Sequence, residues 1–62
     1  MYEIQLAIDG YTFTEKVYGR SWADALVVAC NNLGYTVKGI IGSVHSASVR
    51  TYGGTMIYAD FV

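Results

Sequence analysis

The only histidine of the chain, His45, lies among serines, a combination that could support nucleophilic catalysis. Ser43, Ser46 and Ser48 surround it, and a histidine beside a serine hydroxyl can act as the base that activates it. However, the sequence offers no residue to orient the imidazole, and no nucleophile-elbow glycine pattern surrounds any of these serines. A solvated, serine-rich strand is the better interpretation, and we expect no enzymatic activity.

Two further side chains, Glu15 and Cys30, could carry chemistry if the fold buried them. Glu15 falls on the apolar face of an alternating segment. Three explanations are open. Glu15 could be a buried catalytic acid, it could lie on an edge strand where its carboxylate reaches water, or a β-bulge near Thr14 could turn it outward. No second acid or base accompanies it, which favours the two structural explanations. Cys30 has no cationic neighbour to activate its thiol, so we interpret it as a buried structural cysteine.

The sequence contains no pattern that would hold a metal, a phosphate or a nucleic acid. One histidine and one cysteine cannot fill a four-ligand zinc site. The glycines lack the strand–loop–helix context of a phosphate-binding loop. The basic residues are scattered and the net charge is −1, so the electrostatic footprint of a nucleic-acid-binding protein is missing. We expect no cofactor, no metal site, no nucleic-acid partner and, since no apolar run could span a bilayer, no membrane partner.

Length and composition predict one small α+β domain over residues 1–62, without linker or tail, whose core needs support. A core of this size rarely supplies more than about 3–5 kcal/mol of net stability unaided. A single cysteine excludes an internal disulfide, and the chain is 53% hydrophobic and only 15% charged. We therefore expect self-association, with a dimer as the simplest form. The N-terminus lacks signal-peptide features and a lone free cysteine fits a reducing compartment, so we expect a cytoplasmic protein.

One helix, predicted over residues 21–34, positions the rest of the chain. Ser21 can cap its first turn, and Asp24 three residues later forms a weaker version of the capping box. Gly34 can take the left-handed conformation that ends a helix. Apolar residues at helical spacing form one stripe with two flanking positions, which together comprise Trp22, Ala25, Leu26, Ala29, Cys30 and Leu33.

The first seventeen residues predict a β-hairpin. Residues 2–8 alternate between apolar and polar types, which indicates a strand with one buried face. Asp9-Gly10 is the strongest short hairpin signal. A two-residue turn there sets the expected register, with the pairs Ile8–Tyr11, Leu6–Phe13, Ile4–Glu15, Tyr2–Val17 and Glu3–Lys16.

Three further strands are expected after the helix, over residues 35–41, 44–52 and 55–62, joined by two-residue turns at Gly42-Ser43 and Gly53-Gly54. The order is then ββαβββ, with a single helix packed on a curved antiparallel sheet. If the fourth strand is instead a loop, the order is ββαββ.

These turns fix which side chains share a face of the C-terminal sheet. One face, expected to lie under the helix, carries Val37, Gly39, Ile41, Val44, Ser46, Ser48, Ile57, Ala59 and Phe61. The other carries Ile40, Ala47, Val49, Met56, Tyr58 and Val62. Because one helix covers only one face, apolar residues on the second face predict a protein interface.

The predicted interface combines this second face with two valines that point largely away from the helix stripe. Its residues are Val27, Val28, Ile40, Val49, Met56, Tyr58 and Val62. The last strand is a further candidate contact, as an edge that could pair with a second copy. Tyr18, Tyr52 and Tyr58 are the outward-facing tyrosines, and tyrosine suits interfaces because it offers a large contact area with a polar tip.

Several runs are loosely similar to dodecins, a family of small flavin-binding oligomers with a strand–helix–strand–strand fold. The similar residues are Ser21-Trp22-Ala23-Asp24-Ala25, Val37-Lys38-Gly39-Ile40-Ile41-Gly42 and Val49-Arg50-Thr51-Tyr52, spread over the last two thirds of the chain. The resemblance implies bound flavin, stacked on an aromatic residue for which Tyr35 is the nearest match. This chain has a much shorter helix, and it adds an N-terminal hairpin.

The leading hypothesis is a small, self-associating, non-enzymatic protein-interaction module. Phage-encoded accessory and inhibitor proteins that bind a host protein are often of this size. The alternatives are an oligomer that binds a small, flavin-like ligand, and a structural subunit of a larger assembly such as a virion.

Overall fold

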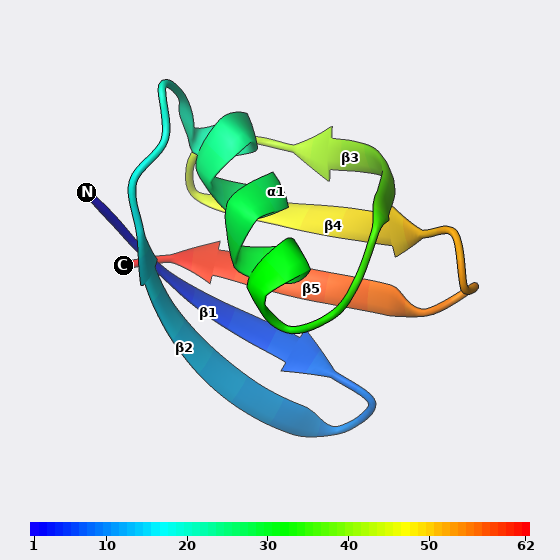
Figure 1. Cartoon of the computed structure of the whole chain (residues 1–62). Helices are drawn as coiled ribbons and strands as arrows, with labels where there is room; N and C mark the ends of the chain where they lie inside the picture. The colour runs from blue at the N-terminus through cyan, green and yellow to red at the C-terminus, as the bar shows by residue number, and fades with distance from the viewer.

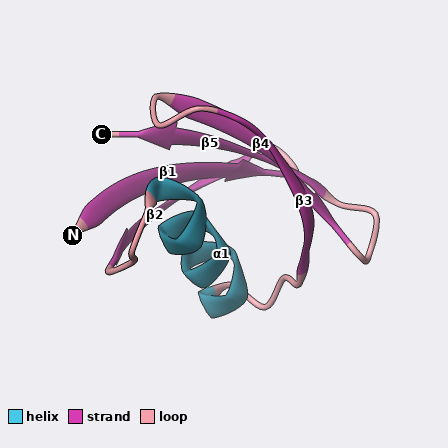
Figure 2. Cartoon of the chain, turned by 90° about the horizontal axis from the view of Figure 1, so that it is seen from above, coloured by secondary structure: helices cyan, strands magenta, loops and turns pink.

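Five strands and one helix follow the predicted order ββαβββ in a computed structural model that describes residues 1–62 (Figure 1). The elements are β1 (Tyr2–Ile8), β2 (Tyr11–Val17), α1 (Trp22–Asn32), β3 (Val37–Gly42), β4 (Ser46–Thr51) and β5 (Met56–Phe61). All strands pair antiparallel in one sheet with the order β2-β1-β5-β4-β3. The sheet curves around α1, which packs against its concave side (Figure 2). The α+β prediction is confirmed, and strand β4 rules out the four-stranded alternative.

The helix begins at the predicted cap. The Ser21 hydroxyl oxygen accepts a hydrogen bond from the Asp24 N–H at 3.2 Å, which satisfies one of the free donors of the first turn. The Asp24 carboxylate in turn accepts from the N–H of Arg20 at 2.9 Å. Gly19 lets the incoming chain pass closely, since a Cβ there would lie 2.6 Å from the backbone nitrogen of Ala25.

The helix ends at Asn32 with Leu33 as its C-cap, and the predicted glycine follows in the left-handed conformation. Gly34 has a φ of +91°, and its N–H donates to the carbonyl oxygen of Asn31 at 3.0 Å. The next N–H, of Tyr35, reaches back to the carbonyl oxygen of Cys30 at 3.0 Å. These two bonds form a Schellman motif, which turns the chain toward β3.

The core is a single layer of side chains between α1 and the sheet. The predicted helix stripe supplies Ala25, Leu26, Ala29 and Cys30, all fully buried, with Trp22 and Leu33 half-buried at its ends. The sheet contributes aliphatic residues from four strands, namely Ile4, Leu6, Ile8, Val17, Ala47, Val49, Ile57 and Ala59. Alanines on both sides of the layer allow the helix to approach the sheet closely.

The N-terminal hairpin has the predicted register throughout. Asp9 and Gly10 both have positive φ, +50° and +83°, as a two-residue type I′ turn requires. Glu15 faces the helix side, but it lies on an edge strand without a bulge. Its half-exposed carboxylate accepts a hydrogen bond from the Asn32 side-chain amide at 3.3 Å. The edge explanation for Glu15 is therefore the correct one.

The predicted register of the C-terminal strands is wrong. Residues 52–55 join β4 to β5, and the Thr51 N–H donates to the Thr55 carbonyl oxygen at 3.2 Å, which leaves Tyr52-Gly53-Gly54 as a three-residue loop between these paired residues. Ser48 therefore lies opposite Tyr58 instead of Ala59. The β3–β4 turn is formed by Val44 and His45, not by Gly42-Ser43, since the Ser43 N–H donates to the Ser46 carbonyl oxygen at 2.9 Å. A slip of one residue exchanges the two faces of a strand.

The last strand is central in the sheet, not an edge. β5 pairs with β1 on one side and with β4 on the other. Both sides of β5 are hydrogen-bonded to neighbouring strands, so β5 has no free edge. The predicted dimer in which residues 55–62 of two copies pair is therefore excluded. The edges of the sheet are β2 and β3.

Candidate interaction surface on the open face of the sheet

The convex face of the sheet has no covering element (Figures 1 and 2). The strand registers place on it every second residue of each strand. Most of these side chains are polar, and the apolar ones are concentrated on β3 and β5. The face consists of Glu3, Gln5, Ala7, Thr12, Thr14, Lys16, Gly39, Ile41, Ser46, Ser48, Arg50, Met56, Tyr58 and Asp60.

Tyr58 occupies the middle of this open face. It is flanked by Ala7 across the β1–β5 pair and by Ser48 across the β4–β5 pair. Because both neighbours are small, its ring stays 58% exposed although it projects from the central strand of the sheet. Its hydroxyl makes no hydrogen bond within the chain, which leaves both the ring and the polar tip available to a partner.

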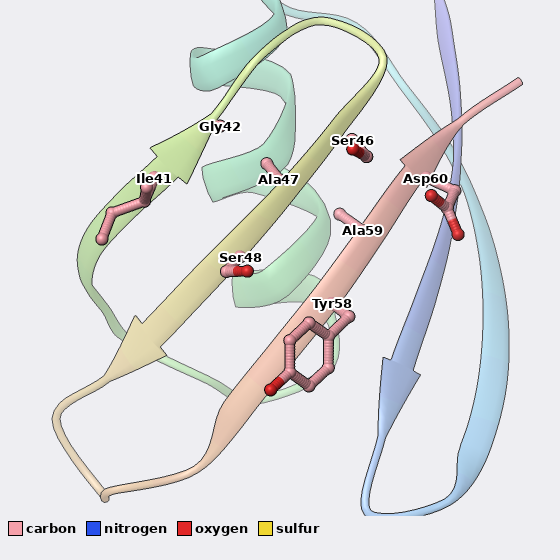
Figure 3. A pocket seen from close by; sticks show the side chains of 8 residues that line it. All are labelled: Ile41, Gly42, Ser46, Ala47, Ser48, Tyr58, Ala59 and Asp60. Carbon is pink, nitrogen blue, oxygen red and sulfur yellow. The ribbon is translucent and has the colours of Figure 1, made fainter.

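A hollow of about 310 Å³ lies beside the tyrosine ring. Its lining residues, labelled in Figure 3, are Ile41, Gly42, Ser46, Ala47, Ser48, Tyr58, Ala59 and Asp60. Ile41, Ser46, Ser48, Tyr58 and Asp60 belong to the open face, whereas Ala47 and Ala59 belong to the core layer. Gly42 helps to form it, because a Cβ at this position would collide with the Ser46 carbonyl oxygen and with Ala47. A complementary protein surface can pack against the projecting aromatic ring and can also insert a side chain into the hollow.

The hollow offers hydrogen bonding and one negative charge. Ser46 lies directly opposite Asp60, and Ser48 directly opposite Tyr58. None of these four polar side chains is hydrogen-bonded to another group of the chain, and neither serine contacts a base. The site can therefore recognise polar groups next to an apolar contact, while nothing in it activates a nucleophile.

Three of the predicted interface residues are exposed as expected. Met56 and Tyr58 lie on the open face, and Val62 follows β5, where its N–H donates to the Glu3 carbonyl oxygen at 2.9 Å. The outward orientation of Tyr18, Tyr52 and Tyr58 is also found.

Three other predicted interface residues belong to the core layer. Val49 is 0% exposed and Ile40 is half-buried against the core, because the observed register turns both toward the helix. Val28 also packs against the core, so it does not point away from it as predicted. Val27 is half-buried on the helix. The prediction of an apolar second face through Ile40 and Val49 is therefore wrong.

The sequence interpretation missed the exposed apolar residues Ile41, Tyr11 and Phe13. The sequence pattern predicts Ile41 on the helix side, but it is 67% exposed on the open face, opposite Ser48. Tyr11 and Phe13 face the helix side of β2 and remain exposed. The helix length could have predicted the exposure of Tyr11 and Phe13. A helix of eleven residues is about 16 Å long and cannot cover five strands.

The remaining chemistry-bearing residues form no site. His45 is exposed in the β3–β4 turn, where its backbone N–H donates to the Ser43 hydroxyl oxygen at 3.2 Å. Cys30 is fully buried, and desolvation raises the pKa of its thiol to about 11. No group of three or more His, Cys, Asp or Glu side chains is close enough to hold a metal ion.

The helix α1 is too short to cross a membrane. In comparisons with known proteins, no family model, no curated protein and no solved structure matches the chain. The function must therefore be argued from the surface itself, and the likeness to dodecins rests only on the short runs given above.

Proposed function

We propose that this domain is a non-enzymatic protein-interaction module that binds a partner protein through the open face of its sheet. The observation that carries the proposal is Tyr58, a largely exposed aromatic ring on the central strand beside a hollow of about 310 Å³. Tyrosine is enriched among the residues that dominate binding energy, because it combines a large contact area with a hydrogen-bonding tip.

The surroundings of Tyr58 support this role. Ile41 and Met56 add exposed apolar surface on the same face, and polar serines and Asp60 lie around them. An apolar centre with a polar periphery is the usual anatomy of a non-obligate interface. We assign the partner to the host proteins that a phage-type accessory or inhibitor protein binds in the cytoplasm, by analogy of size and composition.

The proposal is tested by affinity capture from the native host with matched tyrosine variants. Tyr58→Ala should abolish capture of the partner. Tyr52→Ala should leave it unchanged, because Tyr52 is even more exposed, at 69%, but lies in the β4–β5 loop. Both variants should unfold at the wild-type temperature, since neither ring is buried. Equal capture by both variants would overturn the assignment of the open face.

A further inference from the structure

The two edges of the sheet differ in how they are protected against pairing with another strand. β3 contains a bulge between Val37 and Gly39 and carries two glycines in six residues. β2 pairs with β1 along its whole length without a bulge, and it contains neither proline nor glycine. Its first four residues, 11–14, are exposed. Edge strands of soluble proteins are normally blunted by bulges, charges or proline. The two charges of β2, Glu15 and Lys16, lie together near its end, so residues 11–14 form an edge that has none of these features.

The free backbone groups of β2 can be assigned from one hydrogen bond. The Val62 N–H donates to the Glu3 carbonyl oxygen, so the backbone polar groups of Glu3 point from β1 toward β5. Lys16, the partner of Glu3 in the β1–β2 pair, therefore directs its N–H and C=O away from β1. Because this direction alternates along a strand, Thr14 and Thr12 do the same.

We propose that β2 is a dimerisation edge, at which two copies of this chain pair β2 against β2 around a two-fold axis at Thr14. In this arrangement Thr14 lies opposite Thr14 of the second copy, and Thr12 lies opposite Lys16 of the second copy. All three outward-pointing residues of each copy then take part in hydrogen-bonded pairs, which gives roughly six hydrogen bonds at two per pair. The two sheets become one continuous sheet with both helices on the same side.

The side chains of β2 favour this register over its neighbours. An axis at Glu15 would bring two carboxylates directly opposite each other, which is destabilising. An axis at Phe13 would leave Lys16 outside the ladder. With the axis at Thr14, no like charges meet, and Tyr11 lies opposite Val17 of the second copy, an aromatic–aliphatic pair of the stabilising kind.

This dimer goes beyond the proposed function and does not depend on it. The edge strand β2 is separated from Tyr58 and the hollow by β1. Partner binding and self-pairing can therefore be lost separately.

Disulfide trapping tests the axis with a matched pair of cysteine variants. At the axis, the two copies of residue 14 have Cα atoms about 5.5 Å apart, within the range of a disulfide. The two copies of residue 12 are offset by four positions along the strands, so their Cα atoms are roughly 14 Å apart. Both residues are exposed threonines on the open face of the same strand, and Cys30 is buried in every variant.

Under mild oxidation, Thr14→Cys should form disulfide-linked dimers and Thr12→Cys should remain monomeric on a non-reducing gel. Equal crosslinking of both variants, or none in either, would overturn the proposed axis.

Sedimentation equilibrium gives a second measurement. Wild type and Tyr58→Ala should both sediment as dimers, and Thr14→Pro, which removes an outward N–H at the axis, should sediment as a monomer with wild-type circular dichroism. A monomeric wild type at all concentrations would contradict the dimer while leaving the partner-binding proposal intact.

Discussion

The side-chain hydroxyl of Thr51 is hydrogen-bonded to the backbone of Thr55, across the loop that joins β4 to β5. It donates to the Thr55 carbonyl oxygen at 2.9 Å and accepts from the Thr55 N–H at 3.0 Å. Thr51 is the only buried polar residue of the chain. These bonds hold a three-residue loop, with Gly54 at a φ of +86°, and they thereby set the register that exposes Tyr58 and buries Val49.

Replacing Thr51 with valine should lower the free energy of unfolding by about 1–3 kcal/mol, because the Thr55 backbone loses two hydrogen bonds at a partly buried position. Thr55→Val is the matched control. It keeps the backbone groups that accept and donate, so its unfolding midpoint should change far less. Chemical denaturation of the two variants measures the difference, and equal midpoints would show that the hydroxyl does not hold the loop.

Gly42 and Gly39 give a second matched pair, both in β3. Gly42 has a φ of +143°, and a Cβ there would meet the Ser46 carbonyl oxygen. Gly42→Ala should therefore destabilise the domain by about 1–3 kcal/mol. Gly39→Ala meets no atom within 4 Å, and it should be neutral or slightly stabilising, because alanine reduces the entropy of the unfolded chain. Thermal unfolding of both variants separates the two, and similar losses would contradict the assignment.

The N-terminal half of the fold could be predicted because its signals are local. Asp9-Gly10 specifies the turn that sets the β1–β2 register, and Ser21 and Gly34 mark the ends of the helix. These features depend on residues within a few positions of each other, so the sequence displays them directly.

The C-terminal half could not be predicted because its turns depend on side-chain and long-range contacts. The two glycines at 53 and 54 resemble a two-residue turn, but the Thr51 hydroxyl stabilises a loop that is one residue longer. The additional loop residue shifts the register by one, so β4 and β3 present the opposite faces from those predicted. Ile40 and Val49 therefore point toward the helix instead of toward the open face. The insertion of β5 between β1 and β4 is a long-range pairing, which no local pattern records. Of the residues on the open face, the sequence consequently predicts only Met56 and Tyr58 as interface residues.

Leu26 lies at the centre of the layer between α1 and the sheet and is fully buried. Leu26→Ala should lower the free energy of unfolding by about 2–5 kcal/mol, through the lost apolar burial and the cavity left behind. For a domain of this size, such a loss removes most of its stability. A variant with the wild-type unfolding midpoint would show that the helix does not pack through this residue.

The burial of Cys30 couples stability to alkaline pH. Its pKa is raised to about 11 in the folded chain, above the usual thiol pKa of about 8.5–9 that holds after unfolding. Above that lower pKa the unfolded state releases the proton while the folded state keeps it, so stability falls as pH rises through about 9 to 11. In Cys30→Ala, the part of the stability decrease at alkaline pH that comes from the thiol should be absent. The difference between the two pH profiles of unfolding isolates the thiol, and parallel profiles would contradict its burial.

The open face around Tyr58 is tested most directly by photocrosslinking in the native host. Position 58 is replaced by a photoreactive phenylalanine derivative, and position 52, an exposed tyrosine in the β4–β5 loop, serves as the control. We predict a discrete adduct with one host protein from position 58 and none from position 52. No adduct from position 58, or the same adducts from both positions, would contradict a protein-binding role for this face.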